Sequence, residues 1–138
     1  MKRYAIFGAL GPLLGGFLLL LTATVTSGYW GHPPSLSEAE RWLAVFAKTL
    51  QYSYLFGLVP SLMLGAVDDI LFHIKRIGPV ARLLIVGAIG FAAGELLYGS
   101  RGAGSGTMQF VLHGLVGCVP GAISSGLTYR LLDRSAAA

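Results

Sequence analysis

The sequence has few charged residues. Only 12% of its 138 residues are Asp, Glu, Lys or Arg, whereas soluble domains contain about 25%. Hydrophobic residues make up 54%, and the mean hydropathy is +0.70. A soluble fold of this size buries only about two-thirds of its surface, so it could not hide that much apolar side chain. The composition therefore excludes a soluble domain, and the wealth of aliphatic residues excludes a disordered chain.

The sequence also lacks the motifs that carry chemistry. The single cysteine, Cys118, allows no intramolecular disulfide. No Cys/His spacing typical of zinc, nucleotide-binding fingerprint or nucleophile–base motif is present. The net charge of +4 does not indicate nucleic acid, because the basic residues are scattered between apolar stretches. We therefore expect no enzyme activity, no cofactor, no metal and no nucleic-acid partner.

What the sequence does contain is four long apolar stretches. They predict an all-α integral membrane protein, a single domain over 1–138 with spans at about 4–25, 49–71, 80–98 and 107–128. Each can cross the ~30 Å hydrocarbon core at 1.5 Å per residue. The first stretch also resembles a secretory signal peptide, and its cleavage is the alternative to a first span.

The basic residues predict the orientation of these spans. Seven of the ten would lie on one side of the membrane, in short connections and at both ends of the chain. They are Lys2, Arg3, Lys75, Arg76, Arg82, Arg130 and Arg134. Because cytoplasmic loops carry the excess of Lys and Arg, we expect a multi-pass protein of the bacterial inner membrane with both termini in the cytoplasm.

The longest outer connection predicts a short helix ahead of the second span. Ser37 and Glu40 form a capping-box pattern after two prolines. Over 37–48 the apolar residues recur at helical spacing, which indicates an amphipathic segment lying on the outer leaflet or packing on a partner.

Spans one and three look like copies of one another. RYAIFGALGPLLG from Arg3 matches RLLIVGAIGFAAG from Arg82 at six positions, and GLVP from Gly57 matches GCVP from Gly117. The match predicts two tandem helical hairpins in a parallel repeat, with a pseudo-two-fold axis along the membrane normal. Coincidence among the 20 glycines is the alternative.

Every predicted span carries small residues four positions apart, and the last span carries two such rows. Small residues let helices approach closely in lipid, so we expect these rows to form the packing faces. Packing within one subunit is the plain interpretation, and a contact between one row of the last span and another subunit is the alternative. The residues are Gly11, Gly15, Gly57, Ser61, Gly65, Gly90, Gly94, Gly114, Gly117, Cys118, Gly121, Ala122 and Gly126.

Few ionisable residues fall at membrane depth. Glu95 and His113 are candidates for a hydrogen-bonded or proton-responsive pair. The alternative is that Glu95 reaches the membrane interface or pairs with Arg101, while His113 bonds a backbone carbonyl. His113 is also a remote candidate for a haem or pigment ligand, since Gly114 and Gly117 leave room for a flat ring.

Asp68 and Asp69 stand at the inner end of the second span. We expect them to form a solvated helix end, balanced by Lys75 and Arg76. Adjacent side chains on a helix point ~100° apart, so the two carboxylates are not expected to share a proton or hold a metal.

Two motifs carry a family resemblance. FGALGPLLGG at Phe7 and YLFGLVPSLMLGAVDDIL at Tyr54 resemble small uncharacterised multi-pass inner-membrane proteins of Gram-negative bacteria. The resemblance implies topology and compartment but no residue roles. Small four-span exporters and fluoride channels are similar in size, yet their characteristic polar residues have no match here.

We therefore expect a non-enzymatic membrane protein that acts by helix packing, as an accessory or assembly subunit of a larger complex or as a homo-oligomer. Its partners would be the lipid bilayer and other membrane subunits or a second copy. The alternative is a small transporter or channel with its pathway at the pseudo-two-fold axis, using Tyr52, Glu95, Gln109 and His113.

Overall fold

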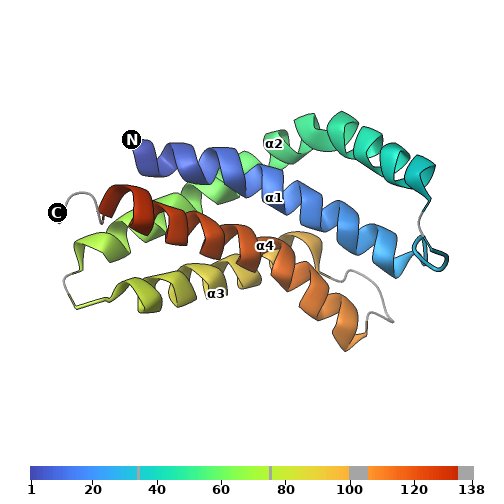
Figure 1. Ribbon diagram of the computed structural model, residues 1–138. Coiled ribbons are helices and arrows are strands. Elements are labelled where there is room, and N and C mark those ends of the chain that lie inside the picture. The colour runs from blue at the N-terminus through green and yellow to red at the C-terminus, as the bar shows by residue number, and fades with distance from the viewer. Residues whose placement is uncertain (34, 75, 100–105, 134–138) are drawn as a thin grey trace.

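A computed structural model describes residues 1–33, 35–74, 76–99 and 106–133. Within these ranges the chain forms four α-helices, one π-helical turn and no strand. The helices are α1 (Lys2–Thr26), α2 (Leu36–His73), α3 (Pro79–Tyr98) and α4 (Thr107–Thr128), and the turn η1 (Tyr129–Asp133) continues α4 (Figure 1). All four helices are long and apolar enough to cross a membrane, which confirms the all-helical prediction at that level.

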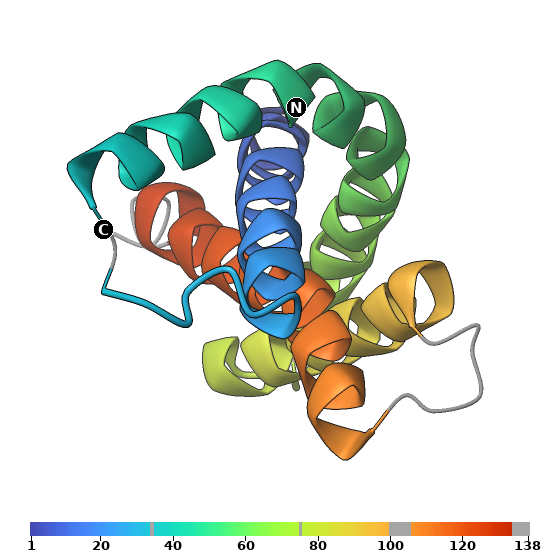
Figure 2. The same ribbon diagram turned by 90° about the vertical axis from the view of Figure 1, so that its right-hand side faces the viewer.

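The helices form two antiparallel hairpins, α1–α2 and α3–α4. Helix α1 packs on α2 and also on α4, while α2 and α3 touch only sparsely. Seen along the bundle, α1 and α4 lie between α2 and α3 (Figure 2). We call the end that holds Lys2, His73 and Thr128 the inner end, and the opposite end the outer end. The first helix begins at this end and the described part of the chain finishes there with η1 (Figure 1).

Helix α2 is longer than one membrane crossing requires. Its 38 residues extend about 57 Å at 1.5 Å per residue, against a hydrocarbon core of ~30 Å. The segments expected at 37–48 and 49–71 are thus parts of one continuous helix. Figure 2 shows that this helix bends, and Pro60 supplies the cause, because its ring removes a backbone donor inside the helix.

The start of α2 corrects the predicted capping box. Ser35 is the N-cap and Glu38 is the third helical residue, with both reciprocal hydrogen bonds present, so the pairing of Ser37 with Glu40 is wrong. Two Ser-x-x-Glu patterns overlap here, Ser35 with Glu38 and Ser37 with Glu40, and no proline lies between positions 35 and 40 to delay the helix. Hydrogen bonding from Ser35, first its backbone N–H and then its hydroxyl, holds the pKa of the Glu38 carboxyl below its usual value.

The amphipathic stripe predicted over 37–48 packs partly on the same chain. The ring of Trp42 meets Phe17 of α1 edge-on with centroids 5.1 Å apart, and Phe46 meets Phe17 at 5.6 Å. The indole N–H of Trp42 donates to the Thr24 hydroxyl over 3.4 Å, and Trp30 donates to the same oxygen over 3.0 Å. These contacts attach the outer part of α2 to the outer end of α1.

The closest helix contacts are made by glycines. A Cβ on Gly90 would lie 2.5 Å from the Gly117 carbonyl oxygen, and one on Gly94 would lie 2.6 Å from that of His113. A Cβ on Gly57 would lie 3.3 Å from Pro12 Cα. The first two separations are shorter than real Cβ contacts, so glycine is required where the backbones of α3 and α4 meet. At Gly57 a methyl group would require Pro12 to shift by a few tenths of an ångström.

Both small-residue rows of α4 are used inside the chain. In one row, Gly114 faces the Phe91 ring and Gly126 faces Leu83. In the other row, Gly117 faces Gly90 and Gly121 faces both Val86 and Leu64. Both rows thus make contacts within the chain.

The two hairpins share one contact pattern. In the first, Gly8 faces Leu58 and Leu62; in the second, Gly87 faces Cys118 and Ala122. These residues are related by the same offsets, 79 and 60 positions, that align the sequence segments.

Candidate functional site at the inner end

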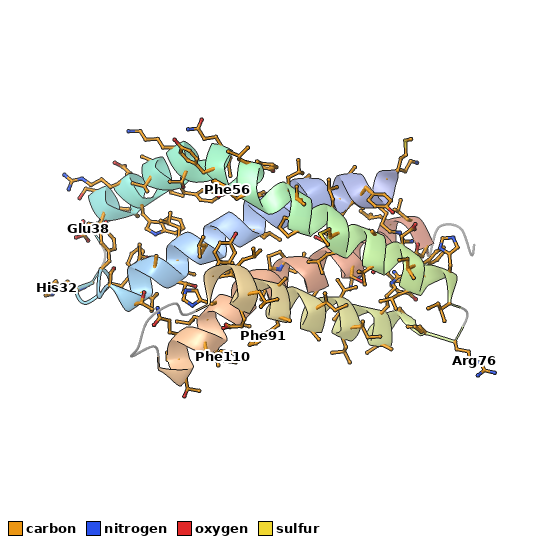
Figure 3. All side chains as sticks on the ribbon, turned by 180° about the vertical axis from the view of Figure 1, so that it is seen from behind. His32, Glu38, Phe56, Arg76, Phe91 and Phe110 are labelled. Carbon is orange, nitrogen blue, oxygen red and sulfur yellow. The ribbon has the colours of Figure 1, made fainter. Side chains whose placement is uncertain are left out.

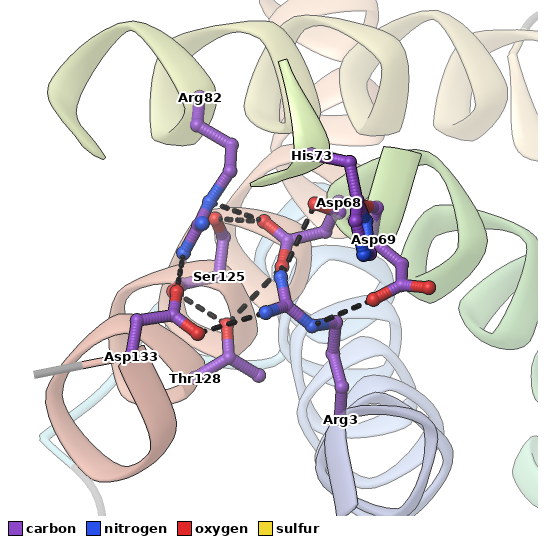
Figure 4. Close-up of polar contacts among 8 residues, drawn as sticks. All are labelled: Arg3, Asp68, Asp69, His73, Arg82, Ser125, Thr128 and Asp133. Atoms are coloured by element: carbon purple, nitrogen blue, oxygen red, sulfur yellow. Dashed lines mark hydrogen bonds and ion pairs between the residues drawn. The ribbon is translucent and has the colours of Figure 1, made fainter. Parts of the chain in front are cut away.

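Four charged side chains, one from each helix or its continuation, meet at the inner end (Figure 4). Arg3 comes from α1, Asp68 from α2, Arg82 from α3 and Asp133 from η1. We call these four residues the charge quartet. Their side chains are between 0 and 8% exposed, so the quartet is enclosed by the bundle and not spread over its surface.

Asp68 is the most enclosed member, with no exposed surface. Arg3 Nη1 donates to its Oδ2 over 2.6 Å, and Arg82 Nε lies 3.0 Å from its Oδ1. The hydroxyls of Ser125 and Thr128 donate to the same carboxylate over 2.6 and 3.3 Å. Both carboxylate oxygens therefore have partners, which is what a buried charge requires.

Asp133 completes the quartet from the end of the π-helical turn. Its Oδ1 accepts from Arg3 over 2.8 Å and its Oδ2 accepts from Arg82 over 2.6 Å. Each arginine thus binds one aspartate of its own hairpin and one of the other. The quartet joins the two hairpins as well as the helices within each.

Two further residues of α2 support the arginines. Asp69 Oδ1 lies 3.3 Å from Arg3 Nε, and its side chain is 37% exposed. The Phe72 ring lies under both guanidinium groups, 4.5 Å from Arg3 Cζ and 5.6 Å from Arg82 Cζ. Such cation–π contacts favour the charged arginine while excluding water from it.

The arrangement suits structural use better than catalysis. The oxygens of Asp68 and Asp133 are taken up by the arginines and hydroxyls, so neither carboxylate is available as a base or metal ligand. Across the described ranges, no group of three His, Cys, Asp or Glu side chains is placed to hold a metal ion. A buried pair of this kind fixes the positions of the elements that supply it.

The expectation that Asp68 is solvated is wrong, because the helix end it occupies is covered by α1, α3 and α4. Lys75, expected to balance it, lies outside the described residues, and Arg76 is exposed and points away from the bundle (Figure 3). Sequence reasoning missed Arg3, Arg82 and Asp133 as members of a site. One signal in the sequence could have indicated the site. Arg3 and Arg82 align with one another, and both stand at the inner ends of their spans, as Asp68 does.

Glu95 and His113 do not form the predicted couple through their buried atoms. Glu95 Oε1 and His113 Nδ1 are both enclosed, and neither has a hydrogen-bond partner among the described residues. Both side chains are half-buried near the outer ends of α3 and α4. Arg101, the other partner considered for Glu95, lies outside the described residues.

A cleft of about 80 Å³ lies along the middle of the bundle. All four helices contribute to its lining, which includes Pro12, Pro60 and Pro120. Ser53, Ser61 and Tyr98 supply the hydroxyls of an otherwise apolar lining. Phe7 is at the inner end of this lining, on the side of the charge quartet. The cleft lining does not include the four residues predicted for an axial pathway, Tyr52, Glu95, Gln109 and His113.

The chain belongs to a protein family of unknown function, DUF5413, whose model matches residues 1–134. Comparison with curated proteins and with solved structures gives no match.

Proposed function

We propose that the chain is a non-enzymatic integral protein of the bacterial inner membrane, with both termini in the cytoplasm, that acts through helix packing. Its role would be that of an accessory or assembly subunit of a membrane complex, or of a homo-oligomer. The observation that supports this best is how its polar groups are used. The quartet binds the helices to one another. Among the described residues of the spans, the charged side chains of the quartet are paired with one another and do not line an open site.

The repeat predicted from the sequence supports a preassembled unit. Arg3 and Arg82, which align in the two halves, take equivalent places between the same two aspartates. The shared glycine contacts of the two hairpins fit the same parallel repeat. Ion pairs that hold the helices together at the inner end keep the lipid-facing surface of the bundle in one arrangement. Less conformational entropy is then lost when a partner binds to that surface.

The surface most suited to a partner is a stripe on α2. Its residues recur at helical spacing, and all are between 56 and 70% exposed. We call this the α2 stripe; it consists of Tyr52, Leu55, Phe56, Val59 and Met63. Because the small-residue rows of α4 are occupied within the chain, a partner would contact this stripe instead. Trp42 attaches α2 to α1 nearby, so the stripe is held in place.

Site-specific photo-crosslinking tests this proposal. A photo-crosslinking amino acid is placed at Phe56 (Figure 3), which is 68% exposed on α2, and separately at Leu84, which is 64% exposed on α3. In native membranes we expect a discrete protein adduct from position 56 and none from position 84. Purification in mild detergent should then give the same partner or a second copy. A lone monomer with no adduct at position 56 would contradict the proposal.

The axial cleft favours a second candidate, a small transporter or channel. In this case the cleft would open toward the outer end, and Phe7 with the quartet would close it at the inner end. Liposome flux measures this directly. Flux that is present in the wild type and lost in Gly15→Leu, which would place a large side chain in the cleft lining, would favour transport over packing.

A further inference from the structure

A second hollow, the inner groove, runs between α3 and α4 on the outside of the bundle. It has a volume of about 510 Å³. Val80 and Leu83 of α3 form one side, and Ile123 and Leu127 of α4 form the other. Tyr129 and Arg130 stand at its inner end. The groove is therefore apolar along its length and basic at one end.

The length of the groove matches part of one lipid leaflet. Its lining on the last helix runs from position 122 to position 130, which is about 12 Å at 1.5 Å per residue. Half of a ~30 Å hydrocarbon core is ~15 Å. An acyl chain lying in the groove would thus have its headgroup at the level of Tyr129 and Arg130.

Charge at the inner end selects the headgroup. Arg130 is exposed and has no ion-pair partner among the described residues, unlike Arg3 and Arg82, which the quartet occupies. Lys2 and Arg76 are also exposed at this end of the bundle. An arginine can bind a phosphate oxygen by charge-assisted hydrogen bonds, and the exposed Tyr129, which lines the same groove, offers a hydroxyl donor.

We propose that the inner groove binds an anionic phospholipid of the cytoplasmic leaflet. One acyl chain lies between Leu83 and Ile123, and the headgroup phosphate is bound by Arg130 with Tyr129. The inference rests on the membrane placement given under Proposed function, but it does not depend on whether the chain acts as a subunit or a transporter.

Native mass spectrometry of the full chain in mild detergent tests the site. The probes are phosphatidylglycerol and phosphatidylcholine with identical acyl chains, and soluble glycerol phosphate. We expect the wild type to retain phosphatidylglycerol better than phosphatidylcholine and to show no binding of glycerol phosphate. Retention of glycerol phosphate would overturn the proposal in favour of a soluble phosphate ligand.

Three variants separate the site from general attraction to a basic surface. Arg130→Gln should lower the apparent affinity for phosphatidylglycerol by about fivefold. Arg76→Gln, which removes an exposed arginine outside the groove, should change it much less. Ile123→Trp fills the groove at a position that is 42% exposed, and it should weaken binding of both lipids.

Three further results would overturn the proposal: equal losses in the two arginine variants, unchanged binding in Ile123→Trp, or equal retention of the two lipids by the wild type. All are measured on the purified chain. A missing partner or missing flux would refute the proposed functions without affecting these results.

Discussion

Asp68→Asn removes the central charge of the quartet while preserving the size of the side chain. The asparagine can still accept hydrogen bonds through one oxygen, but Asp133 is then the one buried carboxylate left to Arg3 and Arg82, and the part-exposed Asp69 remains beside Arg3. Removing one partner of a buried ion pair destabilises proteins by about 3–5 kcal/mol, because the remaining charge stays buried and uncompensated. We expect a loss of this order from Asp68→Asn.

Asp69→Asn is the matched control, since it makes the same chemical change at the next residue. The Asp69 side chain is 37% exposed and has one ion pair at 3.3 Å, so solvent screens it. Exposed pairs contribute about 0–1 kcal/mol.

Thermal unfolding in detergent, followed by circular dichroism, measures the difference between the two variants. We expect the midpoint of Asp68→Asn to fall on the order of 10 °C below that of the wild type, and that of Asp69→Asn to fall only slightly. Similar midpoints for Asp68→Asn and Asp69→Asn would refute the reasoning that burial makes the quartet a main support of the bundle.

Two further predictions concern packing and the start of α2. Gly117→Ala places a methyl group against the Gly90 carbonyl and should destabilise the bundle by about 1–3 kcal/mol in the same unfolding assay. Gly15→Ala is the control and should be tolerated, because the nearest neighbour of a Cβ at Gly15 is 3.7 Å away. Equal effects of the two variants would contradict the close approach of α3 and α4. Because the folded pKa of Glu38 is lowered, its capping contact stabilises the helix start above the unfolded pKa and is lost as pH falls through the lowered value. Hydrogen exchange over residues 36–39 should therefore show extra opening at acid pH, beyond the intrinsic pH dependence of exchange, in the wild type and not in Glu38→Gln.

Much of the fold follows from the sequence because hydrophobic length is a direct signal. The four apolar stretches predict the four helices, since lipid requires every backbone polar group to be bonded within the helix. The continuity of α2 was harder to predict, because an amphipathic segment and an apolar span differ in polarity but not in helical spacing. The position of the first helical residue depended on which of two overlapping Ser-x-x-Glu patterns acts as the cap.

The quartet could be predicted only in part. Arg3 and Arg82 are visible as equivalent residues, but charges at the ends of spans are normally solvated, so their burial depends on how the helices pack. Asp133 lies beyond the fourth span, and it reaches the arginines through the π-helical turn, whose geometry a hydropathy pattern does not contain. Likewise, the row of small residues on α4 could face its own chain or another until the positions of α2 and α3 were known.

The central claim is that the polar groups of this chain join its two hairpins. A double-mutant cycle on Arg3 and Asp133, which come from different hairpins and lie 2.8 Å apart, tests it most directly. Unfolding free energies are measured for Arg3→Gln, Asp133→Asn and the double variant. We predict a coupling of about 1–3 kcal/mol, the range for residues in one buried network. Effects that add to within about 0.5 kcal/mol would contradict the claim, because independent residues behave in that way.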